Sequence, residues 1–408
     1  MTRRPLVNRL IPLAGLLLAV AVARSQDSAP PAAVAAAAPL PPLPAPMDIP
    51  RPGPTNDAPY APQPILPGGV VVTLFPPGSH YLNMAKAAQA EVYNMDGSVP
   101  GRIASIVNIH NPSIEFHPGE RSLNTGAAII LAAGGGHNTL NVGGEGADFV
   151  HFFYNYGINT VILRNRLRRD GYNPKTDEVY DAQQAIKMVR AHAKDWRLDP
   201  NKIGIVGFSA GAELAAPAAL QYEAFDQSNN VPENPLAAYS SRPDFVGIIY
   251  PGPSPFTRGA APAIPKDCPP SFITCAGWGD AVHAVWANEY FTAMLNDGVP
   301  NVEMHIYARG HHPGDRVGPD EPPSTGGLTD RGFIAYGTWE YRFLDWFKDL
   351  GFMQKPGVET QAAKDVAANV HRPPPGARGG GRRGGGAPGA GTNAPAGVPA
   401  NVPPRGPQ

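Results

Sequence analysis

Residues 203–211 constrain the fold of this chain more than any other segment. An apolar run at 203–206 leads directly into Gly-Phe-Ser-Ala-Gly at 207–211, and small residues in a helical pattern continue to residue 220. A strand that turns this tightly into a helix needs glycines where the two elements close on each other. Ser209 would then lie on a strained turn with its hydroxyl above a sheet. The alternative is a turn whose glycines serve packing alone.

Short apolar runs alternate with helical patterns through the middle of the chain, which is typical of a mostly parallel sheet covered by helices on both faces. We therefore predict an α/β fold. Helices are expected at 284–295, at 339–350, directly after Ser209, and from a cap at Thr176 through residue 193. Strands are expected at 127–132, 160–163, 203–206, 246–250, 272–276 and 303–307 (the last at an edge), with an antiparallel entry to the sheet near 70–74 and 103–110.

The two ends of the chain differ in composition from its middle. Arg3 and Arg4 precede an apolar stretch at 10–22, and residues 23–25 place small residues where a signal peptidase requires them. The apolar stretch is short for a membrane-spanning helix, and no cysteine follows it to carry a lipid anchor. The 49 Pro and 46 Gly residues are crowded toward both ends, a composition typical of disorder. We predict a signal peptide at 1–25, an Ala/Pro-rich linker at 26–67, one α/β domain at 68–355 and a disordered tail at 356–408, in a secreted or periplasmic protein.

Charge and cysteine content exclude several classes of partner. The net charge is −1, which gives no reason to expect nucleic acid or an anionic membrane as a partner. Cys268 and Cys275 are too few for a disulfide scaffold and lack zinc-site spacing. Cys275 is expected to be buried, and a bridge between the two cysteines is left open. No group of His, Cys, Asp and Glu has metal-ligand spacing in the sequence, so neither a metal nor a cofactor is expected.

A second glycine-rich segment follows the strand predicted at 127–132. Residues 134–137 read Gly-Gly-Gly-His. Glycines at this point free backbone amides to face a carbonyl oxygen, and together with the Ala210 amide they would stabilise an oxyanion. The sequence leaves open which two amides of Gly135, Gly136 and His137 take this role. An ordinary strand-to-helix turn is the alternative, while a nucleotide-binding loop is disfavoured because the GxGxxG spacing is missing.

A serine nucleophile needs a base, and the base needs an orienting acid, in the chain order serine, acid, histidine. Asp280 follows the strand predicted at 272–276 and is the predicted acid. It could instead cap the following helix, and Asp267 is a poorer candidate. Nearby, Trp278 and Trp286 are candidates for stacking on a sugar ring, although packing in the core is favoured for both.

His312 is the predicted base because it directly follows the strand expected at 303–307. It is preferred over its neighbour His311. His305 within that strand and His283 at a helix start are expected to be structural. The segments 222–242 and 252–270 are the expected walls of the site.

Several further motifs together resemble a known family. They are Ala-Gly-Gly-Gly-His at 133–137, Gly-Glu-Gly at 144–146, Leu-Arg-Asn-Arg-Leu at 163–167 and Asp-Ala-Gln-Gln-Ala-Ile at 181–186. The most specific is Leu-Asp-Pro-Asn-Lys-Ile-Gly-Ile-Val-Gly-Phe-Ser-Ala-Gly at 198–211, followed by Arg-Pro-Asp-Phe at 242–245 and Tyr-Pro at 250–251. From about residue 127 to 350 the chain resembles the α/β-hydrolase superfamily, and within it the bacterial acetylxylan-esterase and BD-FAE-like carbohydrate esterases.

This resemblance implies a function and a set of site residues. Ser209 would be the nucleophile, Asp280 the acid and His312 the base, with oxyanion contacts from Gly136, His137 and Ala210. The family implies ester cleavage on decorated plant polysaccharides, chiefly of O-acetyl groups, without a cofactor. A serine peptidase of the prolyl-oligopeptidase kind, a lipid or polyester esterase, and an inactive binding protein of the same fold are the alternatives.

The chain also departs from the family pattern. Ala212-Glu213 stands where Gly-His is usual after the serine turn, Asn165 replaces a frequent Tyr, and His137 replaces an aromatic residue that often lines the acyl pocket. A long polar loop from Pro313 to about Gly332 follows His312. The acyl and alcohol preferences therefore stay open.

Overall fold

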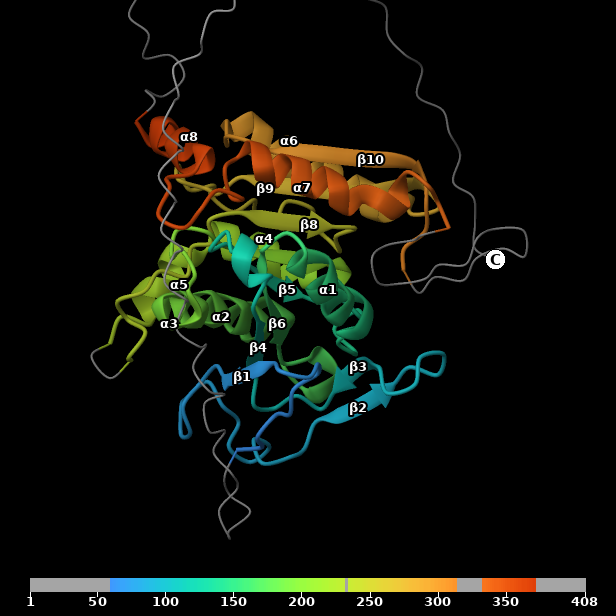
Figure 1. Ribbon diagram of the computed structural model, residues 1–408, viewed down its shortest axis with the longest axis vertical. Helices are drawn as coiled ribbons and strands as arrows, with labels where there is room; N and C mark the ends of the chain where they lie inside the picture. Colours follow the sequence, from blue (N-terminus) through green and yellow to red (C-terminus); the bar gives the residue numbers. More distant parts are fainter. Residues whose placement is uncertain (1–58, 232–233, 314–331, 372–408) are drawn as a thin grey trace, which may run out of the picture. The chain divides into compact units, whose positions relative to one another are not determined.

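The computed structural model describes residues 59–231, 234–313 and 332–371, which are coloured in Figure 1. The predicted signal peptide lies outside these residues, as do positions 26–58 of the predicted linker, most of the predicted tail and most of the loop after His312. Among the described helices, none has the length and apolar character needed to cross a membrane.

One mixed sheet forms the centre of the described chain, with the strand order β1-β4-β6-β5-β7-β8-β9-β10. Strand β4 pairs antiparallel with both β1 and β6, and all the following neighbours pair in parallel. The predicted α/β fold and its mostly parallel sheet are confirmed. The strands are β1 (Val70–Thr73), β4 (Ser113–His117), β5 (Ala128–Ala132), β6 (Asn159–Arg164), β7 (Ile203–Phe208), β8 (Val246–Ile249), β9 (Ser271–Trp278) and β10 (Glu303–Arg309).

The entry to the sheet differs from the prediction. Strand β3 (Ile103–Val107) pairs with β2 (Val92–Met95) in a separate two-stranded sheet, so placing 103–110 in the main sheet is wrong. Strand β4, which was not predicted, takes that place. Its polar residues concealed it: Glu115 is fully buried, faces Arg164 as an ion pair, and accepts from the amides of Ile65 and Leu66 at 2.6 and 2.9 Å.

The helices predicted from the sequence are present, and the structure adds α1 and α8, which were not predicted. In Figure 1, α7 lies in front of the sheet and α6 behind it. Aromatic pairs hold α1 against α7, with ring centroids 5.7 Å apart for Phe149 and Trp339 and 5.6 Å apart for Phe152 and Tyr341. The helices are α1 (Asp148–Tyr154), α2 (Val179–Ala191), α3 (Ala193–Trp196), α4 (Ala212–Leu220), α5 (Tyr222–Ser228), α6 (Ala281–Asp297), α7 (Trp339–Asp349) and α8 (Gln361–Val370).

The start of α2 corrects one predicted cap. The side chain of Asn173 accepts a hydrogen bond of 2.9 Å from the Lys175 amide, and a single π-helical turn over Pro174–Glu178 leads into α2. Asn173 is therefore the cap in place of Thr176. Pro174 favours this start because a proline has no amide hydrogen to leave unbonded in a first helical turn.

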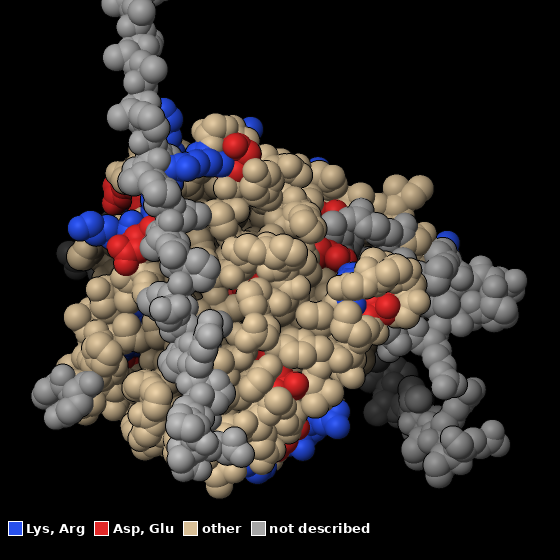
Figure 2. Space-filling view, turned by 60° about the horizontal axis from the view of Figure 1, so that its bottom comes forward, with Lys and Arg blue, Asp and Glu red and all other residues tan. Residues whose placement is uncertain are grey.

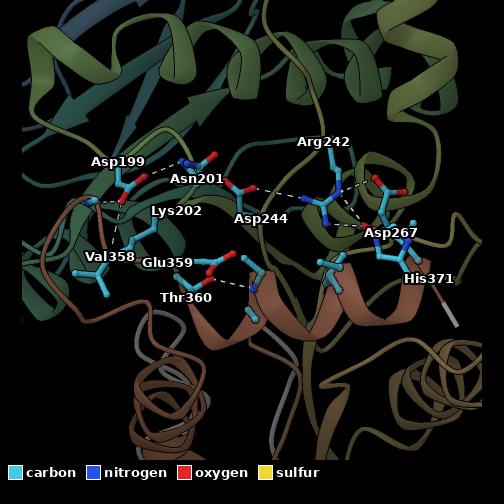
Figure 3. Close-up of a pocket in the computed structure, with 16 residues that line it drawn as sticks. Asp199, Asn201, Lys202, Arg242, Asp244, Asp267, Val358, Glu359, Thr360 and His371 are labelled. Atoms are coloured by element: carbon cyan, nitrogen blue, oxygen red, sulfur yellow. Dashed lines mark hydrogen bonds and ion pairs between the residues drawn. The ribbon is translucent and has the colours of Figure 1, made fainter.

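Helix α8 lies beyond residue 355, the predicted end of the domain. It borders a cavity of about 650 Å³ near the start of β7 (Figure 3). The two basic groups Lys202 and Arg242 there already have partners. Lys202 Nζ donates to the carbonyl oxygens of Gln354 and Lys355 at 2.9 and 3.0 Å, and the Arg242 guanidinium donates to the carbonyl oxygen of Asp267 at 2.6 and 2.8 Å. The bonds of Lys202 join the C-terminal segment to the start of β7, and we call the region around this cavity the seam.

Both cysteines are free and fully buried, so no bridge joins Cys268 and Cys275. Burial raises the pKa of each thiol to about 12, which leaves both uncharged and unreactive near neutral pH. The expected burial of Cys275, within β9, is confirmed.

Charged side chains are sparse on the face shown in Figure 2, where acidic and basic groups lie in small mixed clusters toward the margins. On this face of the described residues no large patch of one sign gathers. That distribution agrees with a chain of which only 16% is charged.

Candidate active site

Ser209 lies on the tight turn between β7 and α4, with a backbone φ of +52°. A positive φ is uncommon for a residue other than glycine and marks local strain. Glycine is required on both sides of the turn. A Cβ on Gly207 would come within 2.3 Å of the Gly211 carbonyl oxygen, and one on Gly211 within 1.9 Å of the Ala132 carbonyl oxygen. The half-buried serine is therefore held at the carboxyl end of the central strand.

His312 connects Ser209 to Asp280. Its Nε2 lies 2.9 Å from Ser209 Oγ, and its Nδ1 lies 3.4 Å from Asp280 Oδ2. The acid follows β9 and the histidine follows β10, and these neighbouring parallel strands bring both side chains to the sheet edge at which β7 ends. Asp280 is buried, with 4% of its surface exposed. In this arrangement the imidazole can accept the serine proton while the carboxylate orients the ring.

The structure bears on two alternatives to Asp280 as the catalytic acid: that Asp280 caps a helix instead, and that Asp267 is the acid. Asp280 precedes α6, but its side chain makes no capping hydrogen bond to that helix. Its Oδ1 is hydrogen-bonded to Nδ1 of His283 instead. Asp267 is hydrogen-bonded to the hydroxyl of Tyr222 and faces Arg242, at the seam beneath α8.

The other two histidines in or just after β10, His311 and His305, make contacts of their own. His311 is buried with its ring at an angle to Phe333, at a centroid distance of 5.3 Å. His305 lies 2.7 Å from Glu303 within β10, in the structural role expected for it.

His283 is a site residue that sequence reasoning missed. Its ring stacks on that of His312 with centroids 3.9 Å apart and 12° between the planes. The available signal is its spacing of three residues from Asp280, which puts the two side chains on one side of the first helical turn. Asp280 is thus shared between two imidazoles.

Asp280, His283 and His312 form a group whose donor atoms lie within 4.8 Å of one another, close enough to raise the question of a metal ion. An imidazole nitrogen binds a metal through a lone pair that lies in the plane of its ring. Two rings stacked nearly in parallel cannot both direct such lone pairs at one ion. The arrangement therefore fits a metal poorly.

The predicted oxyanion loop lies against the serine. A Cβ on Gly134 would be only 2.8 Å from Ser209 Cβ. Gly136 and His137 take positive φ values of +62° and +60°. Within the described residues, no acceptor is hydrogen-bonded to the amides of Gly135, Gly136 or His137, whereas the Gly134 amide donates to Glu145 Oε2 at 2.6 Å. These amides, with that of Ala210 at the start of the next helical turn, remain candidates for holding an oxyanion.

Glu145 connects the oxyanion loop to Tyr250, whose ring contacts His312. Besides the Gly134 amide, it accepts a hydrogen bond of 3.0 Å from the hydroxyl of Tyr250, whose ring meets that of His312 edge-on at 5.1 Å. Burial raises the pKa of the Glu145 carboxyl. The sequence showed Glu145 only as part of a family motif, because its partners are distant along the chain.

Three departures from the family pattern meet in one network. His137 Nδ1 lies 2.7 Å from Glu178 Oε2, and its Nε2 lies 3.4 Å from Glu213 Oε1. The side-chain amide of Asn165 donates to the same Glu178 oxygen at 3.3 Å. Burial opposes the charged form of His137, but its bonds to Glu178 and Glu213 outweigh burial and raise its pKa to about 9. His137 is therefore positively charged near neutral pH.

A cavity of about 710 Å³ adjoins the oxyanion loop at Gly136 and His137. The expected wall at 252–270 contributes six of its lining residues, and the described residues of the expected wall at 222–242 contribute none. Trp278 is 74% exposed at the end of β9, so core packing, the favoured role for it, is wrong. It remains a candidate for contact with substrate.

This topology, with a serine turn after the central strand and the acid and histidine after later strands, defines an α/β-hydrolase. Residues 117–249 match the BD-FAE family model, and the predicted resemblance to BD-FAE-like esterases is confirmed.

The proteins that are similar to this chain include an esterase, a xylanase and a bifunctional hydrolase. An acetylxylan esterase of Xylanibacter ruminicola is 30% identical over 127 residues, which cover 31% of this chain and 23% of that protein. Endo-1,4-beta-xylanase B of Butyrivibrio fibrisolvens is 30% identical over 124 residues, 30% of this chain and 19% of that protein. The chain thus spans less than a quarter of the length of each of these two relatives. The acetyl ester-xyloside bifunctional hydrolase of Caldicellulosiruptor lactoaceticus, a crystal structure, shares the fold with a TM-score of 0.52 at 21% identity, over 71% of this chain and 99% of that chain.

Proposed function

We propose that this chain is an exported serine carboxylic-ester hydrolase that removes O-acetyl or related ester groups from plant polysaccharides such as acetylated xylan. One observation carries the chemistry: His312 Nε2 lies 2.9 Å from the hydroxyl of Ser209 on its strained turn, with Asp280 at the other ring nitrogen. The similarity to an acetylxylan esterase and to an endo-1,4-beta-xylanase supports an ester bond on a polysaccharide as the substrate. Export is supported by the sequence pattern at residues 1–25 alone.

In the first step, His312 Nε2 takes the proton from Ser209 as Oγ attacks the ester carbonyl carbon. Negative charge develops on the carbonyl oxygen, and the amides of Ala210, Gly136 and His137 are the donors that would hold it. Asp280 stabilises the imidazolium that forms. His312 then gives the proton to the alcohol oxygen, the carbon–oxygen bond of the ester breaks and the alcohol leaves.

In the second step, water attacks the acyl-serine with His312 again acting as base. The carboxylic acid leaves, and the proton returns to Ser209 Oγ. Both steps transfer protons and an acyl group without moving electrons to an acceptor, so the residues named suffice for the chemistry.

The test is acetate release from acetylated xylan, measured beside 4-nitrophenyl esters of increasing chain length, for the wild type and Ser209→Ala. The proposal predicts serine-dependent acetate release and a preference for short acyl chains. A preference for long chains without acetate release would point to a lipid or polyester esterase. Absence of serine-dependent hydrolysis in folded protein would point to a binding protein of this fold.

A further inference from the structure

Three basic side chains line the cavity beside the oxyanion loop. Arg168 follows β6, Lys175 lies in the turn before α2, and Arg258 lies in the segment after β8. Within the described residues, none of the three forms an ion pair with a carboxylate. Three separate segments therefore direct unpaired positive charge toward one space.

The single acidic residue in the lining does not offset this charge. Glu213 lies 3.4 Å from Nε2 of His137, which also bonds Glu178 and is itself positively charged near neutral pH. The single imidazolium is shared by the two carboxylates Glu178 and Glu213, which leaves one negative charge against the three basic groups and a net positive charge in the cavity. Because the whole chain has a net charge of −1, general basicity does not explain this local excess.

Arg168 is hydrogen-bonded to the oxyanion loop, beside the catalytic serine turn. Arg168 Nη2 donates a hydrogen bond of 3.0 Å to the carbonyl oxygen of Gly136, whose own amide is a candidate oxyanion donor. Val179, Pro217 and Pro253 are among the apolar residues that line the same cavity. A cleft whose lining carries a net charge of one sign concentrates ligands of the opposite charge.

We propose that this cavity binds a carboxylate carried by the ester substrate, so that the enzyme prefers acidic esters to neutral ones. The inference rests on the proposed esterase function and adds the class of substrate. Guanidinium groups bind carboxylates through paired hydrogen bonds. Arg168 and Arg258 each supply one guanidinium group to this cavity. An acidic sugar beside the acetylated residue, or an acyl group that ends in a carboxylate, would provide the same charge.

Two matched substrate pairs separate these sources. The acyl pair is mono-(4-nitrophenyl) glutarate and 4-nitrophenyl valerate, which have the same chain length. The alcohol pair is acetylated xylo-oligosaccharide with and without a glucuronic acid branch. We expect kcat/KM to be at least about tenfold higher for the acidic member of one pair at low salt, with the ratio falling as salt screens the charges.

Variants test the residues. Lys175→Gln and Arg258→Gln should each lower the ratio of acidic to neutral kcat/KM several-fold, and the double variant should bring it close to one. Lys194→Gln, on the exposed side of α3, is the matched control and should leave both the ratio and the hydrolysis of the neutral ester unchanged.

The outcomes are distinct. A preference in the acyl pair alone supports an acidic acyl group, and a preference in the sugar pair alone supports an acidic oligosaccharide. Ratios near one in both pairs, with neutral esters hydrolysed normally, would overturn this inference and leave the esterase function intact. Failure of the wild type to hydrolyse any of the four esters would contradict both.

Discussion

The ring of His283 lies flat against the ring of His312, with centroids 3.9 Å apart, while both histidines approach the carboxylate of Asp280. Tyr250 meets the same His312 ring edge-on. The orientation of His312 toward Ser209 therefore depends on two neighbouring rings as well as on its acid. Asp280 in turn is fastened to the first turn of α6 through His283.

Replacing His283 tests this support. His283→Phe keeps a ring against His312 but removes the hydrogen bond to Asp280, and a hydrogen bond to a charged group contributes about 1.5–3 kcal/mol. We expect kcat/KM on 4-nitrophenyl acetate to fall about tenfold or more, mainly through kcat, because the acid loses its anchor. His305→Phe on β10 is the control and should retain activity. Wild-type kcat in His283→Phe would show that His283 only fills space.

The choice between the adjacent histidines is tested by changing each one. His312→Ala should cost at least about three orders of magnitude in turnover, because removing the base of such a triad disables both steps. His311→Ala removes a ring that packs against Phe333 and should mainly lower the melting temperature. Turnover and thermal unfolding are measured on the same preparations. The opposite pattern, with turnover lost only in His311→Ala, would mean that the base is assigned to the wrong residue.

The sequence predicted most of the sheet and the three groups now found together, because these signals are local. Buried parallel strands read as apolar runs, and the serine turn requires glycines at fixed positions. The order of strands then brings Ser209, Asp280 and His312 to one edge of the sheet.

The features that were missed depend on distant partners. Strand β4 was concealed because its polar residues Ser113, Glu115 and His117 are buried, with Glu115 paired to both Arg164 and His117. Glu145 and His283 acquire their roles only once the sheet places Tyr250 and His312 beside them. The local sequence does not reveal such cross-chain bonds.

The pKa of His137 predicts a pH dependence of stability. Folding raises it from an ordinary value of 6.5 to about 9, so the charged form stabilises the fold fully below about pH 6.5, and this contribution is lost as the pH rises through about 9. Its size is at most about 3–4 kcal/mol, from a pKa difference of about 2.5. His137→Asn removes the titration, and asparagine tolerates the positive φ at this position. Urea unfolding at about pH 6 and about pH 10 should show a larger loss of stability in the wild type than in His137→Asn. Equal losses in the two proteins would contradict the assignment.

The substitution Gly134→Ala tests the contact between the oxyanion loop and the serine turn. An added Cβ would lie 2.6 Å from the Phe208 carbonyl oxygen and 2.8 Å from Ser209 Cβ, so one of the two segments must move. Gly134→Ala should therefore lower kcat by about tenfold or more, since small displacements of reacting groups are costly. Gly97→Ala, where no atom lies within 4 Å of the added Cβ, is the control. Similar kcat values for both variants would show that the loop does not constrain the serine.

Covalent labelling of Ser209 tests the central claim most directly. Folded protein is treated with a fluorophosphonate and its intact mass is measured, followed by peptide mapping. The wild type should gain one phosphonyl group, on Ser209, Ser209→Ala should gain none, and His312→Ala should react far more slowly because its serine is no longer activated. Labelling of Ser209→Ala to the same extent as the wild type, or no labelling of the folded wild type, would contradict the account.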